Sequence, residues 1–247
     1  MDSQIDNLVA KTWVRCHDIP RSRRLLIAVS GIPGSGKTTL ASMVVARLNA
    51  MYRESSPGSS QGGPLAAFVP LDGYHLSRAQ LDKMPNPKEA HFRRGADFTF
   101  DGDGFLHLVK QLRRPLAPET RTIRAPSFDH AIKDPIADDI PIGPRVKVVI
   151  FEGNYLSLNK APWKDSAELM DELWYVDVDK QTAIERLAVR HARAGITNTV
   201  EEGRQRAIKN DMVNGQEVME NRVAVDEIVI SKEDEDWKSH NQNYESD

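Results

Sequence analysis

The eight residues GIPGSGKT, from Gly31 to Thr38, decide the fold of this chain. They match the pattern of a glycine, four residues of any type, a second glycine, a lysine and then serine or threonine. An apolar run from Leu25 to Val29 precedes them and predicts a buried strand, and apolar residues at helical spacing follow them. Glycines let successive backbone N–H groups turn inward, and the helix adds its N-terminal dipole. The sequence therefore predicts a loop that binds the phosphates of a nucleoside triphosphate.

Two side chains of this loop have expected roles of their own. Lys37 supplies a cation for the β- and γ-phosphates, and the hydroxyl of Thr38 is a hard oxygen ligand for Mg²⁺. The expected cofactors are ATP and Mg²⁺. The expected nucleotide-binding residues are Gly31, Ile32, Pro33, Gly34, Ser35, Gly36, Lys37, Thr38 and Thr39.

Length and composition limit the classes of protein to which the chain can belong. Its 247 residues suffice for one α/β core with an insertion or lid. The net charge of −3 argues against bulk nucleic-acid binding, which usually shows as a basic excess. The single cysteine, Cys16, suits a reducing compartment, and no stretch approaches the length of a membrane span. We therefore expect a cytoplasmic protein with no nucleic-acid or membrane partner, and the oligomeric state stays open.

Five short segments rich in valine and isoleucine predict strands, and helical patterns or long connections separate them. This alternation predicts an α/β fold with a parallel sheet and helices on both faces. Pro70 near the end of the second segment favours an edge position for it, because proline cannot donate to a neighbouring strand. The five segments are Leu25–Ser30, Ala66–Leu71, Val146–Phe151, Leu173–Val178 and Glu227–Ile230.

The remaining stretches suggest how the domain is organised. We expect an N-terminal helix within residues 1–24, a single domain over residues 25–231 and a polar tail over residues 232–247. The stretch from Arg53 to Pro64 has the composition of a flexible loop. Six prolines between residues 114 and 145 predict an insertion of short extended pieces.

Two acidic residues follow predicted strands, where an open parallel sheet collects its ligands. Glu152 follows the third strand and is expected to support the metal, although a solvated turn residue is the alternative. Asp72 follows the second strand and could orient an acceptor hydroxyl beside the γ-phosphate and take its proton. The alternative for Asp72 is a turn residue before Gly73.

Four motifs in this order resemble the family of uridine kinases, phosphoribulokinases and pantothenate kinases. They are the phosphate-binding loop, LDGYHL at 71–76, APSFDHAIKDP at 125–135 and IFEGNYL at 150–156. Their details are most similar to a branch described as fructose-transport-system kinases, and the resemblance runs from about Leu25 to Ile230. It implies a three-layer P-loop NTPase sandwich with strand order 2-3-1-4-5. It also implies that Asp72 is the catalytic base, that Glu152 lies near the metal and that a lid carries arginines over the triphosphate.

A helix after the fourth strand could be this lid. Asp179 is a candidate N-cap for a helix from Thr182 to Gly195, within an expected lid over about residues 182–197. Arginine side chains at positions 186, 190 and 193 share one face of this helix, and such a stripe is ordinarily a solvated face. The place of the helix after the fourth strand favours Arg190 and Arg193 as catalytic residues, together with Lys37 and Asp72. Arg186 could instead pair with Glu185 or Glu202, and Gly195 could be a hinge of a lid that is mobile without ligand.

The acceptor site is expected in the loops and the insertion. Its candidate residues are Asp72, Tyr74, His75, Arg93, Arg94, Phe128 and His130. The adjacent pair Arg93-Arg94 suits a carboxylate or phosphate, with a solvated loop or nucleotide contact as alternatives. Uridine kinases hold the nucleoside with a proline-tyrosine-aspartate segment, from which Pro126 to His130 departs because Phe128 lacks a hydroxyl.

These features predict a phosphotransferase with an alcohol group as acceptor. It would move the γ-phosphoryl group of ATP to a nucleoside, pantothenate, glycerate or sugar. The alternative is an NTP hydrolase or switch that acts on a protein partner, which would need no acceptor and would tolerate the loss of Asp72. A nucleotide-binding module with decayed catalysis is a third class, against which the intact Lys37, Thr38, Asp72 and Glu152 argue.

Overall fold

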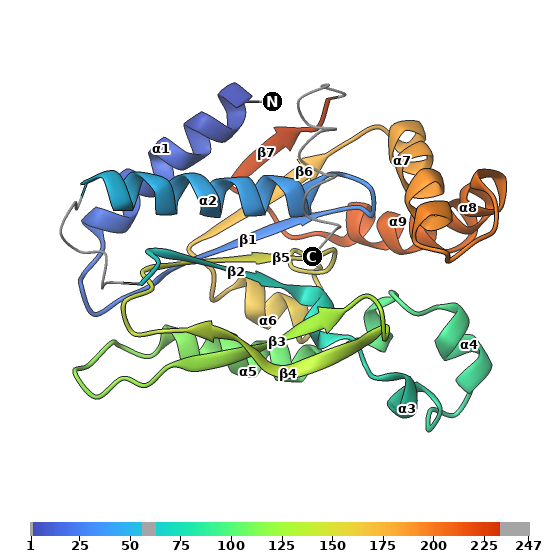
Figure 1. Ribbon diagram of the computed structural model, residues 1–247, viewed down its shortest axis with the longest axis horizontal. Helices are drawn as coiled ribbons and strands as arrows, with labels where there is room; N and C mark the ends of the chain where they lie inside the picture. Colours follow the sequence, from blue (N-terminus) through green and yellow to red (C-terminus); the bar gives the residue numbers. More distant parts are fainter. Residues whose placement is uncertain (1, 56–62, 233–247) are drawn as a thin grey trace.

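The computed structural model, which describes residues 2–55 and 63–232, contains a five-stranded parallel sheet (Figure 1). The strands are β1 (Leu25–Gly31), β2 (Ala66–Pro70), β5 (Val148–Glu152), β6 (Glu172–Asp177) and β7 (Glu227–Ile230). Their spatial order is β2-β5-β1-β6-β7, which confirms the predicted order 2-3-1-4-5. Strand β2 pairs only with β5, so Pro70 lies on an edge strand as predicted.

Alternate residues of the central strand β1 point to opposite faces of the sheet, and both faces are covered. Leu25, Ile27 and Val29 pack with α1 (Asp2–Asp18) and α2 (Lys37–Ser55) on one face. Leu26 and Ala28 belong to the other core, with α5 (Gly102–Arg113) and α6 (Trp163–Ala167). The result is a three-layer sandwich in which β1 is buried along its whole length (Figure 1).

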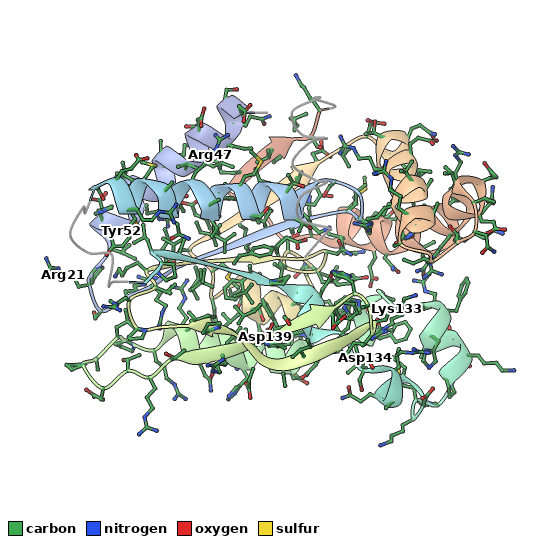
Figure 2. The ribbon with its side chains drawn as sticks, viewed as in Figure 1. Arg21, Arg47, Tyr52, Lys133, Asp134 and Asp139 are labelled. Carbon is green, nitrogen blue, oxygen red and sulfur yellow. The ribbon has the colours of Figure 1, made fainter. Side chains whose placement is uncertain are left out.

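The proline-rich insertion forms an antiparallel hairpin of β3 (Ile123–Asp129) and β4 (Asp134–Ile142). A two-stranded ribbon has a free edge on each strand, so its prolines can sit where no ladder hydrogen bond is needed. The hairpin lies beneath the main sheet beside α5 (Figure 1). Lys133 and Asp134 are at the end of the hairpin that is nearest α3 and α4 (Figure 2).

Two groups of helices stand beyond the carboxyl ends of the strands (Figure 1). The first group follows β2 and consists of η1 (Leu71–Tyr74), α3 (Arg78–Leu81), α4 (Pro87–Phe92) and η2 (Asp97–Thr99). The second follows β6 and consists of α7 (Lys180–Arg193), α8 (Val200–Arg206), the π-helical segment η3 (Ala207–Asp211) and α9 (Met212–Asn221).

Helix α7 begins as its sequence predicts. The Asp179 carboxylate accepts a hydrogen bond from the Thr182 N–H at 2.9 Å, which is an N-cap. The chain leaves the helix at Gly195, whose φ of +62° is a conformation that glycine adopts without strain.

The N-terminal helix α1 is joined to the edge of β7. The Gln4 side chain donates to the Ile230 carbonyl at 3.1 Å and accepts from the Ile230 N–H at 3.0 Å. Most of the predicted loop between Arg53 and Pro64 and nearly all of the predicted polar tail lie outside the described residues. None of the described helices has both the length and the apolar character of a membrane span.

Candidate active site

The phosphate-binding loop is held between helices α7 and α9. Gly34 has φ of +81°, and a Cβ atom there would lie 2.7 Å from the Ala183 carbonyl oxygen of α7, so only glycine fits. On the other side, a Cβ atom on Gly215 of α9 would lie 3.1 Å from the Ile32 side chain. The loop therefore leans on the helices that the sequence identifies as the lid.

Arg186 of α7 is a structural residue of this contact. Its guanidinium donates to the Gly34 carbonyl at 3.3 Å and to the Ser231 hydroxyl at 2.9 Å. Glu185, one of its two expected partners, binds Arg204 instead. Spacing along the helix suggested a local partner, whereas the contact joins segments far apart in sequence.

Lys37 and Glu152 form a buried pair at the centre of the site. The Lys37 Nζ atom lies 3.7 Å from Glu152 Oε1, and their side chains are 10% and 8% exposed. Burial lowers the pKa of Lys37, and Glu152 partly opposes this shift. Burial likewise raises the pKa of Glu152, and Lys37 opposes it. A cation and an oxygen ligand are thus held in a dry environment, where electrostatic interactions are strong.

The oxygen atoms at this point fit a magnesium ion bound together with phosphates. The hydroxyl of Thr38 hydrogen-bonds the Glu152 carboxylate, so two hard oxygen ligands meet beside the loop. Within residues 2–55 and 63–232, no group of three or more His, Cys, Asp or Glu side chains could hold a metal ion by itself. Mg²⁺ ordinarily takes only one or two protein ligands and completes its shell with phosphate and water oxygens.

Asp72 and Arg190 act on the buried pair from opposite sides of the sequence. Asp72 raises and Arg190 lowers the pKa of Lys37, and both also shift the pKa of Glu152. The Asp72 side chain is 52% exposed, and Arg190 is exposed on α7. Arg193 is exposed too, but it is not among the charges that act on Lys37 or Glu152. The structure thus brings one of the two predicted lid arginines to the pair.

On the side of the predicted acceptor, an aromatic stack follows Asp72. The His75 ring lies between Phe100 and Phe128, with centroid distances of 4.0 and 5.1 Å, and His130 contacts Phe128 at 5.2 Å. Gly73 permits this arrangement, since a Cβ atom there would lie 2.2 Å from the Pro126 carbonyl oxygen. The LDGYHL and APSFDH motifs are therefore in direct contact.

Three residues predicted for the acceptor site have other surroundings. Tyr74 is buried with its ring edge-on to Phe105 at 5.3 Å, and burial raises its pKa. Arg94 donates to the Leu76 and Lys133 carbonyls and the Asp134 carboxylate, at 2.9, 2.5 and 2.9 Å. These bonds make Arg94 a strut between the Asp72 segment and the hairpin. Tyr74 and Arg94 are consequently not available to a ligand as predicted.

Arg93 points to a different element from its neighbour. Its guanidinium donates to the Asn214 amide oxygen of α9 at 2.6 Å, so the adjacent pair does not form a joint anion site. Sequence reasoning missed Asn214, for which no local signal exists. It also missed Phe100, although an aromatic residue in the segment TFTFD after an arginine pair could have indicated a ring beside the acceptor.

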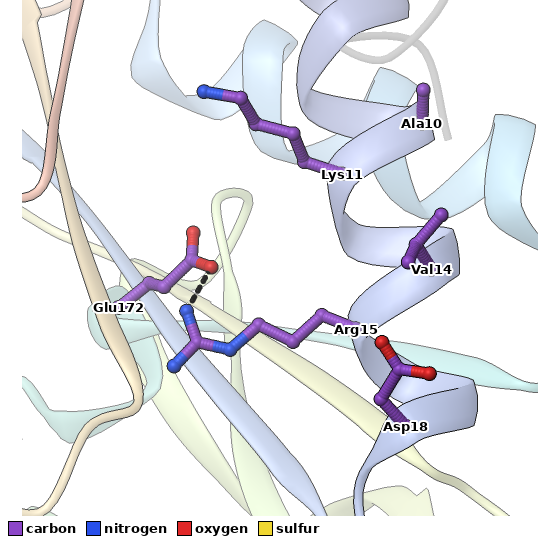
Figure 3. A pocket seen from close by; sticks show the side chains of 6 residues that line it. All are labelled: Ala10, Lys11, Val14, Arg15, Asp18 and Glu172. Atoms are coloured by element: carbon purple, nitrogen blue, oxygen red, sulfur yellow. Dashed lines mark hydrogen bonds and ion pairs between the residues drawn. The ribbon is translucent and has the colours of Figure 1, made fainter.

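One surface hollow lies away from this site. It is lined by Ala10, Lys11, Val14, Arg15, Asp18 and Glu172 (Figure 3). Arg15 and Glu172 form an ion pair across it. Glu172 begins β6, whereas the phosphate-binding loop follows the carboxyl end of β1, so the hollow belongs to the opposite edge of the sheet.

Comparison with known proteins identifies two similar sequences over most of the fold. No family model matches the chain. The ATP-dependent kinase-like protein notR' of Aspergillus versicolor is 50% identical over 159 residues, which are 64% of this chain and 92% of that protein. The "Putative uridine kinase C227.14" of Schizosaccharomyces pombe is 39% identical over 211 residues, which are 85% of each chain.

A solved structure has the same fold. It is a "putative fructose transport system kinase" from Silicibacter sp. TM1040, which is 31% identical, with a TM-score of 0.74. The match covers 91% of this chain and 98% of that one. Together with the phosphate-binding loop and the order of the strands, these similarities show that the chain belongs to the uridine kinase-like family of ATP-dependent P-loop kinases.

Proposed function

We propose that the protein transfers the γ-phosphoryl group of ATP to a hydroxyl group of a small metabolite. Lys37 and the backbone N–H groups of the loop bind the phosphates, and Thr38 and Glu152 hold Mg²⁺. When bound, the magnesium ion neutralises charge on the phosphate oxygens. Catalysis of this kind depends mainly on positioning and on electrostatic stabilisation, which a dry and preorganised site supplies.

The observation that supports a kinase most directly is the place of Asp72. Its carboxylate is half exposed, yet it acts on the pKa values of both Lys37 and Glu152. A hydroxyl group bound between Asp72 and the γ-phosphate would be oriented by this carboxylate, which would accept its proton as the O–P bond forms. A hydrolase or switch, whose nucleophile is water, has no need of an acceptor-facing carboxylate at this point.

Arg190 is the proposed lid cation. Its charge acts on the same buried pair, and its guanidinium is free to reach a transferring phosphoryl group. Phosphoryl transfer develops charge on the equatorial oxygens, which an arginine stabilises. Arg193 stays a weaker proposal for the same role, because it is one turn farther along the exposed face of α7.

The test is ATP consumption with Mg²⁺ against a panel of acceptors, with the product identified by mass. The panel contains uridine, cytidine, pantothenate, glycerate and pentose and hexose sugars. A phosphorylated product that disappears in Asp72→Asn establishes the kinase and names its acceptor. Hydrolysis that no acceptor alters, and that Asp72→Asn leaves unchanged, would support the hydrolase or switch instead.

A further inference from the structure

His75 is held in one orientation beside Asp72. Its ring is stacked between Phe100 and Phe128, and only 13% of the side chain is exposed. Its Nδ1 atom lies 2.9 Å from the Asp72 backbone carbonyl oxygen and 3.8 Å from the Asp72 carboxylate. A ring that is stacked on two sides and bonded at one nitrogen cannot turn freely.

The hydrogen bond at Nδ1 determines which nitrogen carries the proton. A carbonyl oxygen only accepts hydrogen bonds, so Nδ1 must be the donor. Burial lowers the pKa of His75; the nearby Arg94 and His130 lower it further, while Asp72 opposes them. The ring is therefore neutral, and Nε2 is left as a hydrogen-bond acceptor.

The Nε2 atom has no hydrogen-bond partner among the described residues. It belongs to the same ring as Nδ1, which lies beside the Asp72 carboxylate, so one small molecule can contact both residues. Two hydrogen-bond acceptors thus stand side by side at the proposed site of transfer. They favour a ligand with two donor groups and disfavour a carboxylate or phosphate at this point.

We propose that His75 accepts, through Nε2, a hydrogen bond from a donor group next to the reacting hydroxyl of the acceptor. Asp72 takes the reacting hydroxyl, and His75 takes its neighbour, so the site selects acceptors with adjacent donors, of which a vicinal diol is the simplest. This inference rests on the proposed kinase function. It disfavours the 5′-hydroxyl of a nucleoside, whose neighbouring carbon bears the ring oxygen and no hydroxyl.

The arginines are consistent with this substrate class. Arg94 is saturated by the hairpin and by Leu76, and its guanidinium lies 5.6 Å from the Phe128 ring centroid. Its bonds to these groups support the aromatic stack that positions His75. An anionic group on the acceptor, if one is present, would have to lie away from Asp72 and His75.

Three substitutions of His75 separate its possible roles. His75→Asn keeps an amide donor near the position of Nδ1 and removes Nε2. His75→Gln extends an amide oxygen toward the position of Nε2, and His75→Phe keeps the stacking and removes both nitrogens. Thermal unfolding of each variant checks that it is folded, and the KM for ATP checks the nucleotide site.

The decisive measurement compares a diol acceptor with its analogue that lacks the neighbouring hydroxyl. Glycerate and 3-hydroxypropionate form such a pair, and the corresponding deoxy analogue serves for any other acceptor found in the panel. With the unchanged protein we expect kcat/KM to fall about tenfold for the analogue. In His75→Asn and His75→Phe the diol should lose about as much, the analogue should lose little more, and His75→Gln should recover part of the discrimination.

The possible failures are distinguishable. If an acceptor is phosphorylated in a manner that depends on Asp72 but is indifferent to His75→Asn, this inference falls and the kinase stands. An acceptor without a donor next to its reacting hydroxyl, or equal losses for the diol and its analogue in His75→Asn, would also overturn it. If no acceptor is phosphorylated and Asp72→Asn has no effect on ATP turnover, the proposed function falls and takes this inference with it.

Discussion

Lys37 and Glu152 face each other 3.7 Å apart, in a site where burial opposes the charge of both. Lys37 comes from the start of α2 and Glu152 from the end of β5, which are brought together because β1 and β5 are neighbours in the sheet. The phosphate groups of ATP and a magnesium ion would supply the charges that this pair lacks. An empty site of this kind costs stability, which is a common feature of catalytic centres.

The first prediction separates nucleotide binding from phosphoryl transfer. Lys37→Ala should weaken ATP binding and turnover together, because Nζ is the loop's own cation. Asp72→Asn should leave ATP affinity unchanged and lower the transfer rate by about 10²–10⁴-fold, the usual contribution of a general base. Calorimetric titration with ATP and single-turnover kinetics measure the two effects. Equal losses of ATP affinity in both variants would contradict the division of roles.

The second prediction concerns pH and the stability of the protein without ligands. Because burial raises the pKa of Glu152 above its ordinary 4.5, the folded protein keeps this proton where the unfolded chain has released it. The contribution of Glu152 to stability therefore falls as the pH rises through that window. Glu152→Gln removes this loss, and it also lowers the pKa of Lys37 further, which acts in the same direction.

Urea denaturation of both proteins across about pH 4.5 to 8 measures this effect. The free energy of unfolding of Glu152→Gln, relative to the unchanged protein, should rise with pH. A difference that falls with pH would show that the attraction of Lys37 for Glu152 outweighs burial.

The third prediction compares two arginines of one helix. Arg190 and Arg193 are both exposed on α7, so their substitution by alanine should affect folding equally little. Arg190→Ala should lower kcat by about 10²-fold or more because its charge reaches the buried pair, and Arg193→Ala should change kcat less. Steady-state kinetics at saturating ATP distinguish them. A larger effect of Arg193→Ala would mean that the helix turns when substrate binds.

The fourth prediction locates the mobile part of the lid. The first half of α7 is tied to the phosphate-binding loop and to Ser231 through Arg186, so it should be protected with or without nucleotide. Binding of a non-hydrolysable ATP analogue should slow hydrogen exchange over residues 190–206, beyond this attachment. Identical exchange over residues 190–206 in both states would exclude a lid there.

The fifth prediction uses the close approach at Gly73. Gly73→Ala places a Cβ atom against the Pro126 carbonyl oxygen, so the hairpin must move away from the Asp72 segment. The KM for the acceptor should rise severalfold while the KM for ATP stays the same. Gly143→Ala, at a glycine where a Cβ atom would meet nothing within 4 Å, is the matched control. A change in the KM for ATP alone would place the hairpin on the nucleotide side.

Much of the fold could be predicted because it depends on local patterns. The strand before the loop, the N-cap at Asp179 and the edge position of Pro70 follow from residue types within a few positions of each other. The order of the strands came from the resemblance to a family. The candidate site was predictable only in part: Asp72 and Glu152 were identified because they end strands, and Tyr74 was misjudged because sequence periodicity does not show which side of a short turn faces the core.

By itself, the sequence determined the phosphate-binding loop, because glycines and a lysine at this spacing allow one backbone shape and one chemistry between a strand and a helix. Only the tertiary structure decided the roles of the arginines. Arg94 is taken up by the hairpin, Arg93 by Asn214 and Arg186 by the loop, while Arg190 faces the buried pair. Long cationic side chains are alike in sequence, and their partners lie 40 to 152 residues away along the chain, so only the folded arrangement selects which of them remains available to the phosphates.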